Sequence, residues 1–108
     1  SALAEAEFEV ILNGNPGSRV KAEDGSYCTR ESPNGVDLNR NWDNHWKHDN
    51  DTGEHPFSEP ETKLSRQAME AFRPDLYLSI HSGTLGLYMP WAYSTKQFRG
   101  PNQEAMMR

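Results

Sequence analysis

Residues 58 to 74 carry the clearest secondary-structure pattern in this sequence, and that pattern limits the folds open to the chain. Ser58 stands three residues before Glu61, which is the spacing of a capping box, and Pro60 lies where a helix tolerates its missing N–H. Pro74 ends the run. The apolar residues between these signals recur at helical spacing: Leu64, Ala68, Ala71 and Phe72. We therefore predict a helix with one apolar face.

Apolar and polar residues alternate in the next segment, residues 75 to 82, which predicts a strand with two different faces. Residues 8 to 12 and 85 to 91 are typical of two further short strands. Strands on either side of a helix predict an α/β fold, here part of a mixed, mostly parallel sheet with flanking helices and right-handed crossovers. Ligands of such sheets bind beyond the carboxyl ends of the strands, and His81 stands at one such end.

Turn-forming and polar residues dominate most of the first half of the chain. Residues 13 to 18 predict a turn, and residues 19 to 35 show so little periodicity that we predict a long loop. Residues 44 to 55 predict a second loop. Loops of this length inside compact domains are often functional, so their side chains are candidates for a binding site.

A chain this poor in aliphatic residues is not expected to build a large core of its own. Leu, Ile, Val and Phe make up about 16% of the 108 residues, below the roughly 20% under which globular folding becomes difficult. The mean hydropathy is -0.92, yet the net charge is only -5 and aromatic residues are present, which does not fit a disordered tail. We expect a part of a larger domain, or a domain that depends on a partner.

Charge and hydropathy patterns exclude several classes of function. No apolar run approaches the roughly 18 residues of a transmembrane helix, and no signal peptide opens the chain. A pI of about 5.3 without a stripe of Lys and Arg argues against nucleic acid as a partner. The single Cys28 cannot form an internal disulfide, and we interpret it as a packing residue or as half of a disulfide with an outside cysteine. The compartment stays open.

The densest polar cluster lies in residues 34 to 43. Arg40 can bind a carboxylate through two parallel N–H bonds, and Asn39 can add an amide donor, so the pair could hold the anionic end of a ligand. The same residues also fit a surface loop stabilised by Asx turns. The residues alone leave both interpretations open.

Four histidines are the candidates for metal binding or acid–base chemistry. His81 could be a metal ligand, a general base or a structural histidine that bonds to backbone. His45 and His48 lie three residues apart in a polar loop, and we interpret them as solvated surface. No His-x-x-Glu or His-Glu-x-x-His occurs, so these residues alone do not complete a zinc site with three protein ligands.

Three runs of residues together resemble one family, the zinc metallocarboxypeptidases, which include carboxypeptidases A and B and the cytosolic carboxypeptidases. The runs are GVDLNRNW at residues 35–42, PFSEPET at residues 56–62 and LSIHSG at residues 78–83, and their order also matches. The resemblance implies a zinc-exopeptidase-like fold, of which residues 1–108 form the central fragment of a single catalytic domain.

The resemblance also implies roles for individual residues. Asn39 and Arg40 resemble the pair that holds the terminal carboxylate of the substrate. His81 resembles the third zinc ligand, and Ser82 resembles the neighbour that shapes the substrate subsite. Asp37 resembles the carboxylate that orients another ligand histidine.

The resemblance further implies an arginine that stabilises the oxyanion. Arg30 is the best match, and Arg19 is the alternative. The two zinc ligands of the family's His-x-x-Glu and its general-base Glu have no counterpart in these 108 residues. We therefore predict that the isolated chain is inactive and does not bind zinc tightly.

The implied function is zinc-dependent hydrolysis of the C-terminal peptide bond, with Zn2+ as cofactor. The implied partners are peptide or protein C-termini and the remainder of the catalytic domain. A catalytically inactive relative that binds peptide C-termini, or that serves as a structural module, is the alternative. The side-chain preference at the cleaved residue is not given by this segment.

Overall fold

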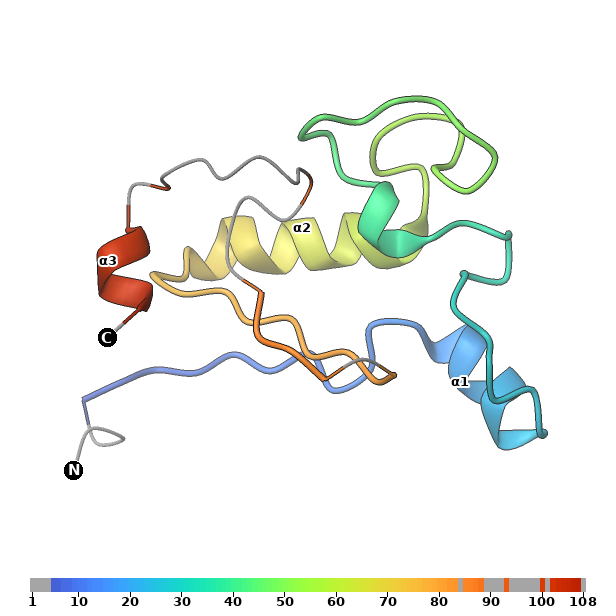
Figure 1. Ribbon diagram of the computed structural model, residues 1–108, viewed down its shortest axis with the longest axis horizontal. Helices are drawn as coiled ribbons and strands as arrows, with labels where there is room; N and C mark the ends of the chain where they lie inside the picture. Colours follow the sequence, from blue (N-terminus) through green and yellow to red (C-terminus); the bar gives the residue numbers. More distant parts are fainter. Residues whose placement is uncertain (1–4, 84, 89–92, 94–99, 101, 108) are drawn as a thin grey trace. The chain divides into compact units, whose positions relative to one another are not determined.

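The computed structural model describes residues 5–83, 85–88, 93, 100 and 102–107 (Figure 1). The chain divides into two compact units, Ser1–Leu76 and Tyr77–Arg108. The first unit contains helix α1 (Pro16–Glu23), the short 3-10 helix η2 (Leu38–Arg40) and helix α2 (Pro60–Phe72). The second contains the single turn α3 (Gln103–Met106).

The predicted mixed sheet is wrong for the part of the chain that the structure describes, where no residue is in a strand. Residues 8–12 and 75–80 lack helix and turn, but they form no backbone ladder with any other described segment. A strand requires a neighbour that takes up its N–H and C=O groups. Residues 85–88 also form no strand, and the end of that predicted strand lies outside the described residues. The alternation of apolar and polar residues therefore did not suffice to predict that these segments pair as strands.

Helix α2 is confirmed, but its start differs from the predicted capping box. The N-cap residue is Glu59, whose side chain makes no cap hydrogen bond, and Pro60 occupies the first turn. The hydroxyl of Ser58 instead contacts side chains of the preceding loop and of Glu59. Arg73 closes the helix in the left-handed conformation, with φ of 54°, and its N–H donates to the Met69 carbonyl. Pro74 then prevents continuation.

The outer surface of α2 is polar and paired. Arg66 Nε donates to Glu70 Oε1 at 2.7 Å, one turn along the helix. This hydrogen bond and the charge of Glu70 raise the pKa of Arg66 above its ordinary value. The predicted apolar face is only partly covered, because Leu64 is 65% exposed whereas Ala68 and Phe72 are half-buried. The buried contacts of helix α2 lie at its N-terminal end, at Glu59 and Thr62.

Helix α1 replaces the turn and part of the long loop predicted for residues 13 to 35. Asn15 caps it by accepting from the Ser18 amide at 3.1 Å, and Pro16 fills the first helical position. The Ser18 hydroxyl donates to the Glu31 carbonyl. Gly17 lies so close to the Pro33 ring that an added Cβ would be 2.2 Å from Pro33 Cγ. These contacts support helix α1, which the weak apolar periodicity of its sequence did not predict.

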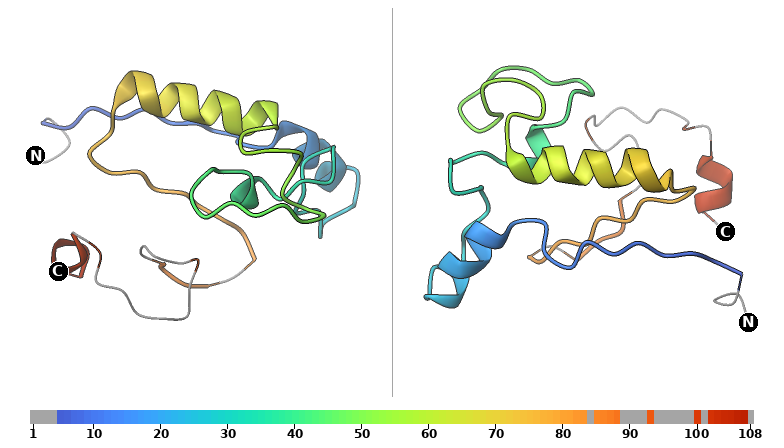
Figure 2. Two further views of the ribbon diagram at one scale, coloured as in Figure 1. Left: turned by 90° about the horizontal axis from the view of Figure 1, so that it is seen from above. Right: turned by 180° about the vertical axis from the view of Figure 1, so that it is seen from behind.

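The core of the described residues is polar. Val36 is the one buried apolar residue among them. The buried polar residues come from three stretches of the first unit and are Ser18, Ser32, Asp37, Asn41, Thr52, Glu59 and Thr62. Between Asn41 and Ser58 the chain forms a loop that returns to the start of α2, as both views of Figure 2 show. Hydrogen bonds, not apolar contacts, therefore organise this region.

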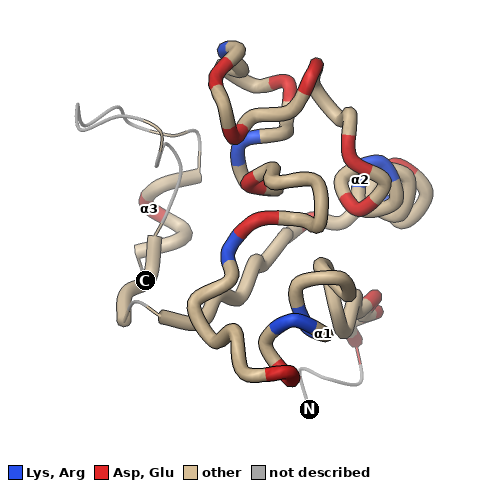
Figure 3. The backbone as a smooth tube through the Cα atoms, turned by 90° about the vertical axis from the view of Figure 1, so that its right-hand side faces the viewer, with Lys and Arg blue, Asp and Glu red and all other residues tan. Residues whose placement is uncertain are grey.

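Lysines and arginines are interspersed with the more numerous aspartates and glutamates along the backbone of the first unit (Figure 3). In the second unit the side chains of Leu78, Ile80 and Leu87 are exposed. No helix among the described residues is long and apolar enough to cross a membrane.

Candidate functional site

The Asn39–Arg40 pair, which we predict to hold a ligand carboxylate and therefore call the clamp, lies on the short helix η2. Asp37 starts this helix: its Oδ1 accepts from the Asn39 amide at 3.0 Å, and its carbonyl accepts from the Arg40 amide at 2.8 Å. This is the Asx turn expected for a surface loop. Both residues of the clamp are exposed. The turn therefore presents two adjacent polar side chains at the surface of the first unit.

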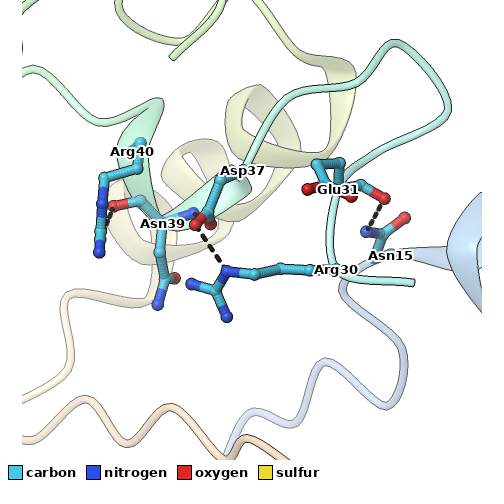
Figure 4. Close-up of polar contacts among 6 residues, drawn as sticks. All are labelled: Asn15, Arg30, Glu31, Asp37, Asn39 and Arg40. Carbon is cyan, nitrogen blue, oxygen red and sulfur yellow. Dashed lines mark hydrogen bonds and ion pairs between the residues drawn. The ribbon is translucent and has the colours of Figure 1, made fainter. Parts of the chain in front are cut away.

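Asp37 also connects the clamp to Arg30. Its second carboxylate oxygen, Oδ2, accepts from Arg30 Nε at 2.7 Å (Figure 4). The Asp37 side chain is largely buried, whereas that of Arg30 is 52% exposed. Since each oxygen of one carboxylate fixes a different segment, Arg30 and the clamp are held in a common arrangement.

The Arg40 guanidinium keeps much of its capacity to bind an anion. Its Nη1 donates to the Asn39 carbonyl at a long 3.4 Å. Among the described residues the ion pairs of arginine involve Arg19, Arg30 and Arg66, and not Arg40. A guanidinium carries five N–H donors in a planar fork that matches a carboxylate. The chemistry of Arg40 therefore fits recognition of a ligand carboxylate.

Asn41, directly after the clamp, is fully buried and uses its whole side chain. Its Nδ2 donates to the carbonyls of Thr52 at 2.8 Å and His55 at 3.1 Å, and to Ser58 Oγ at 2.9 Å. Its Oδ1 accepts from the Glu59 amide at 3.2 Å and from Thr62 Oγ1 at 2.7 Å. We call Asn41 and these five partners the Asn41 cluster. It ties the clamp to the start of α2.

Gly53 makes room for the Asn41 cluster. A Cβ at this position would be 2.2 Å from Ser58 Oγ and 2.6 Å from Asn41 Nδ2, and the φ of Gly53 is +80°. Both the space and the backbone conformation therefore exclude larger residues. Beside the cluster, Trp42 packs edge-on against Phe57 with ring centroids 5.2 Å apart. The Arg66 guanidinium lies 4.9 Å from the Phe57 ring centroid, which connects the loop to α2.

Glu59 carries a buried carboxylate that faces neutral donors. Its Oε2 accepts from Ser32 Oγ at 2.9 Å and from Asn34 Nδ2 at 3.0 Å, and its Oε1 accepts from Ser58 Oγ at 3.2 Å. These bonds join the segment before Asp37 to the start of α2. Glu59 therefore fixes the residues before the clamp to the start of α2, as Asn41 does for the residue after the clamp.

His81 and Ser82 belong to the second unit, and both are exposed. The ring nitrogen Nε2 of His81 lies 3.1 Å from Ser79 Oγ. From the resemblance we expect the His81 imidazole and the Arg40 guanidinium to face a shared cleft; they belong to different units, and this stays a prediction. Within the described part of the chain, no three His, Cys, Asp or Glu side chains lie where they could hold a metal ion together. His81 therefore supplies at most one of the three protein ligands that a catalytic zinc requires.

The remaining candidates lie elsewhere on the surface. Arg19, the alternative oxyanion residue, pairs with Glu23 on α1 at 2.6 Å. His45 and His48 are exposed, as expected for solvated surface. Cys28 is an exposed free thiol, and both of its interpretations, packing and a disulfide with an outside cysteine, stay predictions. Of the two arginines, Arg30 is the one that the structure joins to the clamp.

Sequence reasoning missed the residues that hold this site in place. Asn41, Gly53, Glu59 and Thr62 had no assigned role, although three of them lie inside the two runs GVDLNRNW and PFSEPET. The useful signal was the density of Asn, Ser and Thr in these runs, since such side chains satisfy buried backbone groups.

A family model described as zinc carboxypeptidase matches residues 12–108 of the chain. No solved structure matches it. The match covers the clamp, the Asn41 cluster, α2 and the segment that contains His81.

Proposed function

The chain belongs to the zinc carboxypeptidase family, and on this premise we propose that it forms the central part of a catalytic domain that hydrolyses the C-terminal peptide bond of peptides or proteins. The exposed side chains of Phe8, Leu12 and Ile80 support a central position, because the remainder of such a domain would cover them. The substrates of this proposal are chains with a free C-terminal carboxylate.

The observation that carries the proposal is the double use of the Asp37 carboxylate. It fixes Arg30 through Nε at 2.7 Å and the clamp through the Asn39 amide at 3.0 Å. A carboxypeptidase needs one group for the terminal carboxylate and another for the oxygen of the adjacent peptide bond. Because these two substrate oxygens lie within one residue of each other, the enzyme groups must also be held close together.

The chemistry of each side chain fits its proposed role. Arg40 binds the terminal carboxylate through parallel N–H bonds, with Asn39 adding a further donor. Arg30 donates to the carbonyl oxygen of the scissile bond as negative charge develops there. The bond to Asp37 uses Nε, so the two terminal nitrogens of Arg30 keep N–H groups for a ligand (Figure 4). Ser82 would border the subsite for the last side chain of the substrate.

Zinc is the metal of this family, but the described residues do not make up a site for it. His81 would contribute one imidazole, and Asp37 would orient a further histidine that this chain does not supply in its described part. A carboxylate has about four acceptor positions, so the two bonds that Asp37 already makes leave room for another. No step of the hydrolysis is assigned to the metal through these residues.

The proposal is tested on the protein at its natural length with one peptide in two forms, with a free and with an amidated C-terminus. We expect cleavage of the free form and little cleavage of the amidated one. Arg40→Ala should raise KM for the free peptide roughly 10- to 100-fold, because it removes a charge-assisted pair of hydrogen bonds. The matched control is Arg40→Lys, which keeps the charge without the fork and should recover only part of the loss.

Three outcomes decide the matter. Loss of the preference for a free terminus in Arg40→Ala supports the clamp. Equal cleavage of both peptides by the unaltered protein contradicts the exopeptidase function. Tight binding of the free peptide without any hydrolysis, in protein supplied with zinc, would favour the inactive peptide-binding alternative.

A further inference from the structure

We propose that Asn41 is a positioning residue that sets the orientation of the clamp by fixing it to the N-terminal end of α2. In calling the Asn39–Arg40 turn a substrate clamp, this inference rests on the proposed function. The mechanical part of the inference, that the Asn41 cluster holds the turn, stands on the hydrogen bonds alone.

The first argument is the position of Asn41 in the chain. It follows Arg40 directly and forms the C-cap of η2, where its amide donates to the Leu38 carbonyl at 3.3 Å. The Asn41 carbonyl accepts from the Phe57 amide at 2.7 Å. Main chain and side chain are thus both fixed at the residue next to the clamp.

The second argument is the directionality of the side-chain bonds. Nδ2 faces the carbonyls of Thr52 and His55, whereas Oδ1 faces the Glu59 amide. Donors and acceptors therefore match in only one orientation of the amide. Because the Asn41 amide is fully buried and hydrogen-bonded at both its nitrogen and its oxygen, it fixes the relative positions of its five partners.

The third argument is that η2 has few other supports. It is one 3-10 turn of three residues, Leu38–Arg40, and such turns are held by few internal bonds. Asp37 fixes its first end through the bond of its amide to the Asp51 carbonyl at 2.8 Å and through Arg30. Asn41 fixes its second end. Loss of the side-chain bonds of the Asn41 cluster would leave the second end held by its main-chain bond to Phe57 alone, and Arg40 would reach a wider range of positions.

The experiment uses two variants in the protein at its natural length. Asn41→Asp keeps the shape but replaces the Nδ2 donor with an acceptor that would face two carbonyls. Thr62→Val is milder, since it removes the hydroxyl that donates to Asn41 Oδ1. Ser18→Ala is the matched control, because it also removes one buried hydroxyl of the first unit, outside the Asn41 cluster.

The first readout is amide hydrogen exchange at Asn39 and Arg40, which needs no enzyme activity. Thr62→Val should accelerate exchange at both amides about fivefold, the factor of one buried hydrogen bond. Ser18→Ala should leave them unchanged. Equal exchange in Thr62→Val and in the unaltered protein would overturn the inference.

The second readout separates KM from kcat on the peptide with a free C-terminus. A misplaced Arg40 should raise KM about tenfold in Asn41→Asp and about fivefold in Thr62→Val, with less effect on kcat. A purely structural loss would lower kcat through fewer folded molecules and leave KM unchanged, which would overturn the inference while the preference for a free terminus still stood. If the unaltered protein shows no such preference, the proposed function fails, and the exchange readout still decides whether Asn41 holds the turn.

Discussion

Residues 32–62, which lead into α2, differ from the extended segments 8–12 and 76–80 in the burial and hydrogen bonding of their residues. Between Ser32 and Thr62 seven residues are buried, six of them polar. Hydrogen bonds within this stretch join them, such as Ser32 to Glu59 and Thr62 to Asn41. In residues 8–12 and 76–80 the apolar side chains are exposed, and no backbone hydrogen bond joins these segments to other described residues. The buried polar residues of the first region find their hydrogen-bond partners within the described chain, whereas the apolar side chains of the extended segments stay uncovered there.

This contrast shows which interactions a short chain can complete locally. Hydrogen bonds of the Asn41 cluster need only partners within about 21 residues of sequence. Burial of an extended apolar segment needs surface on both faces and a paired backbone, which is a larger and less local requirement. A polar loop with a functional turn can therefore have a defined geometry even where the apolar residues beside it stay uncovered.

The strongest way to break the first region is Asn41→Ala. The substitution removes five side-chain hydrogen bonds and takes the acceptor away from the buried Glu59 amide, whereas the carbonyls of Thr52 and His55 keep Trp46 Nε1 and the Ser58 amide as donors. We expect a loss of about 3 to 4 kcal/mol in the free energy of unfolding, measured by urea denaturation. Asn50→Ala, at an exposed position of the same loop, is the control and should change stability by less than about 0.5 kcal/mol. Equal effects would contradict the role of the cluster.

Gly53→Ala should have the next largest effect. Its Cβ would press against Ser58 Oγ and Asn41 Nδ2, and its φ of +80° strains any residue with a side chain. We expect a loss of about 2 kcal/mol in the same denaturation experiment. Gly14→Ala adds the same methyl group where no atom lies within 4 Å and should change stability by no more than about 0.5 kcal/mol.

Leu64→Gln should have the smallest effect on the free energy of unfolding. It tests whether exposed apolar side chains contribute little to stability. Leu64 is 65% exposed on α2, so we expect a change within about 0.5 kcal/mol. Val36→Ala, at the buried apolar position, should cost more than about 1 kcal/mol. A loss above about 2 kcal/mol in Leu64→Gln would show that this face of α2 is covered in the native protein.

Sequence patterns predicted those features that depend on neighbouring residues. Helix α2 was predicted because its periodicity and both of its prolines act locally. The loop over residues 44 to 55 was predicted from its polarity. The motif GVDLNRNW indicated the family that the match over residues 12–108 shows, and the role of Asn39 and Arg40 stays a prediction.

Features that depend on distant partners were missed or wrong. Ser58 has the spacing of a capping residue, but its hydroxyl is used by Asn41, 17 residues earlier in the chain. Alternation in residues 75 to 82 predicted a strand, yet alternation says nothing about whether a pairing segment exists. Helix α1 was missed although Asn15 and Pro16 are local start signals, because its apolar periodicity is weak; Glu31 and Pro33, which contact it, follow it in sequence.

Native-state amide hydrogen exchange in residues 1–108 alone, without the remainder of the proposed domain, tests the central contrast most directly. The amides of Asp37, Arg40 and Phe57 donate to the carbonyls of Asp51, Asp37 and Asn41. We expect them to exchange on the order of a hundredfold more slowly than those of Leu78 and Ile80. Similar protection factors in the two groups would contradict the account that a polar hydrogen-bond cluster holds the clamp in place.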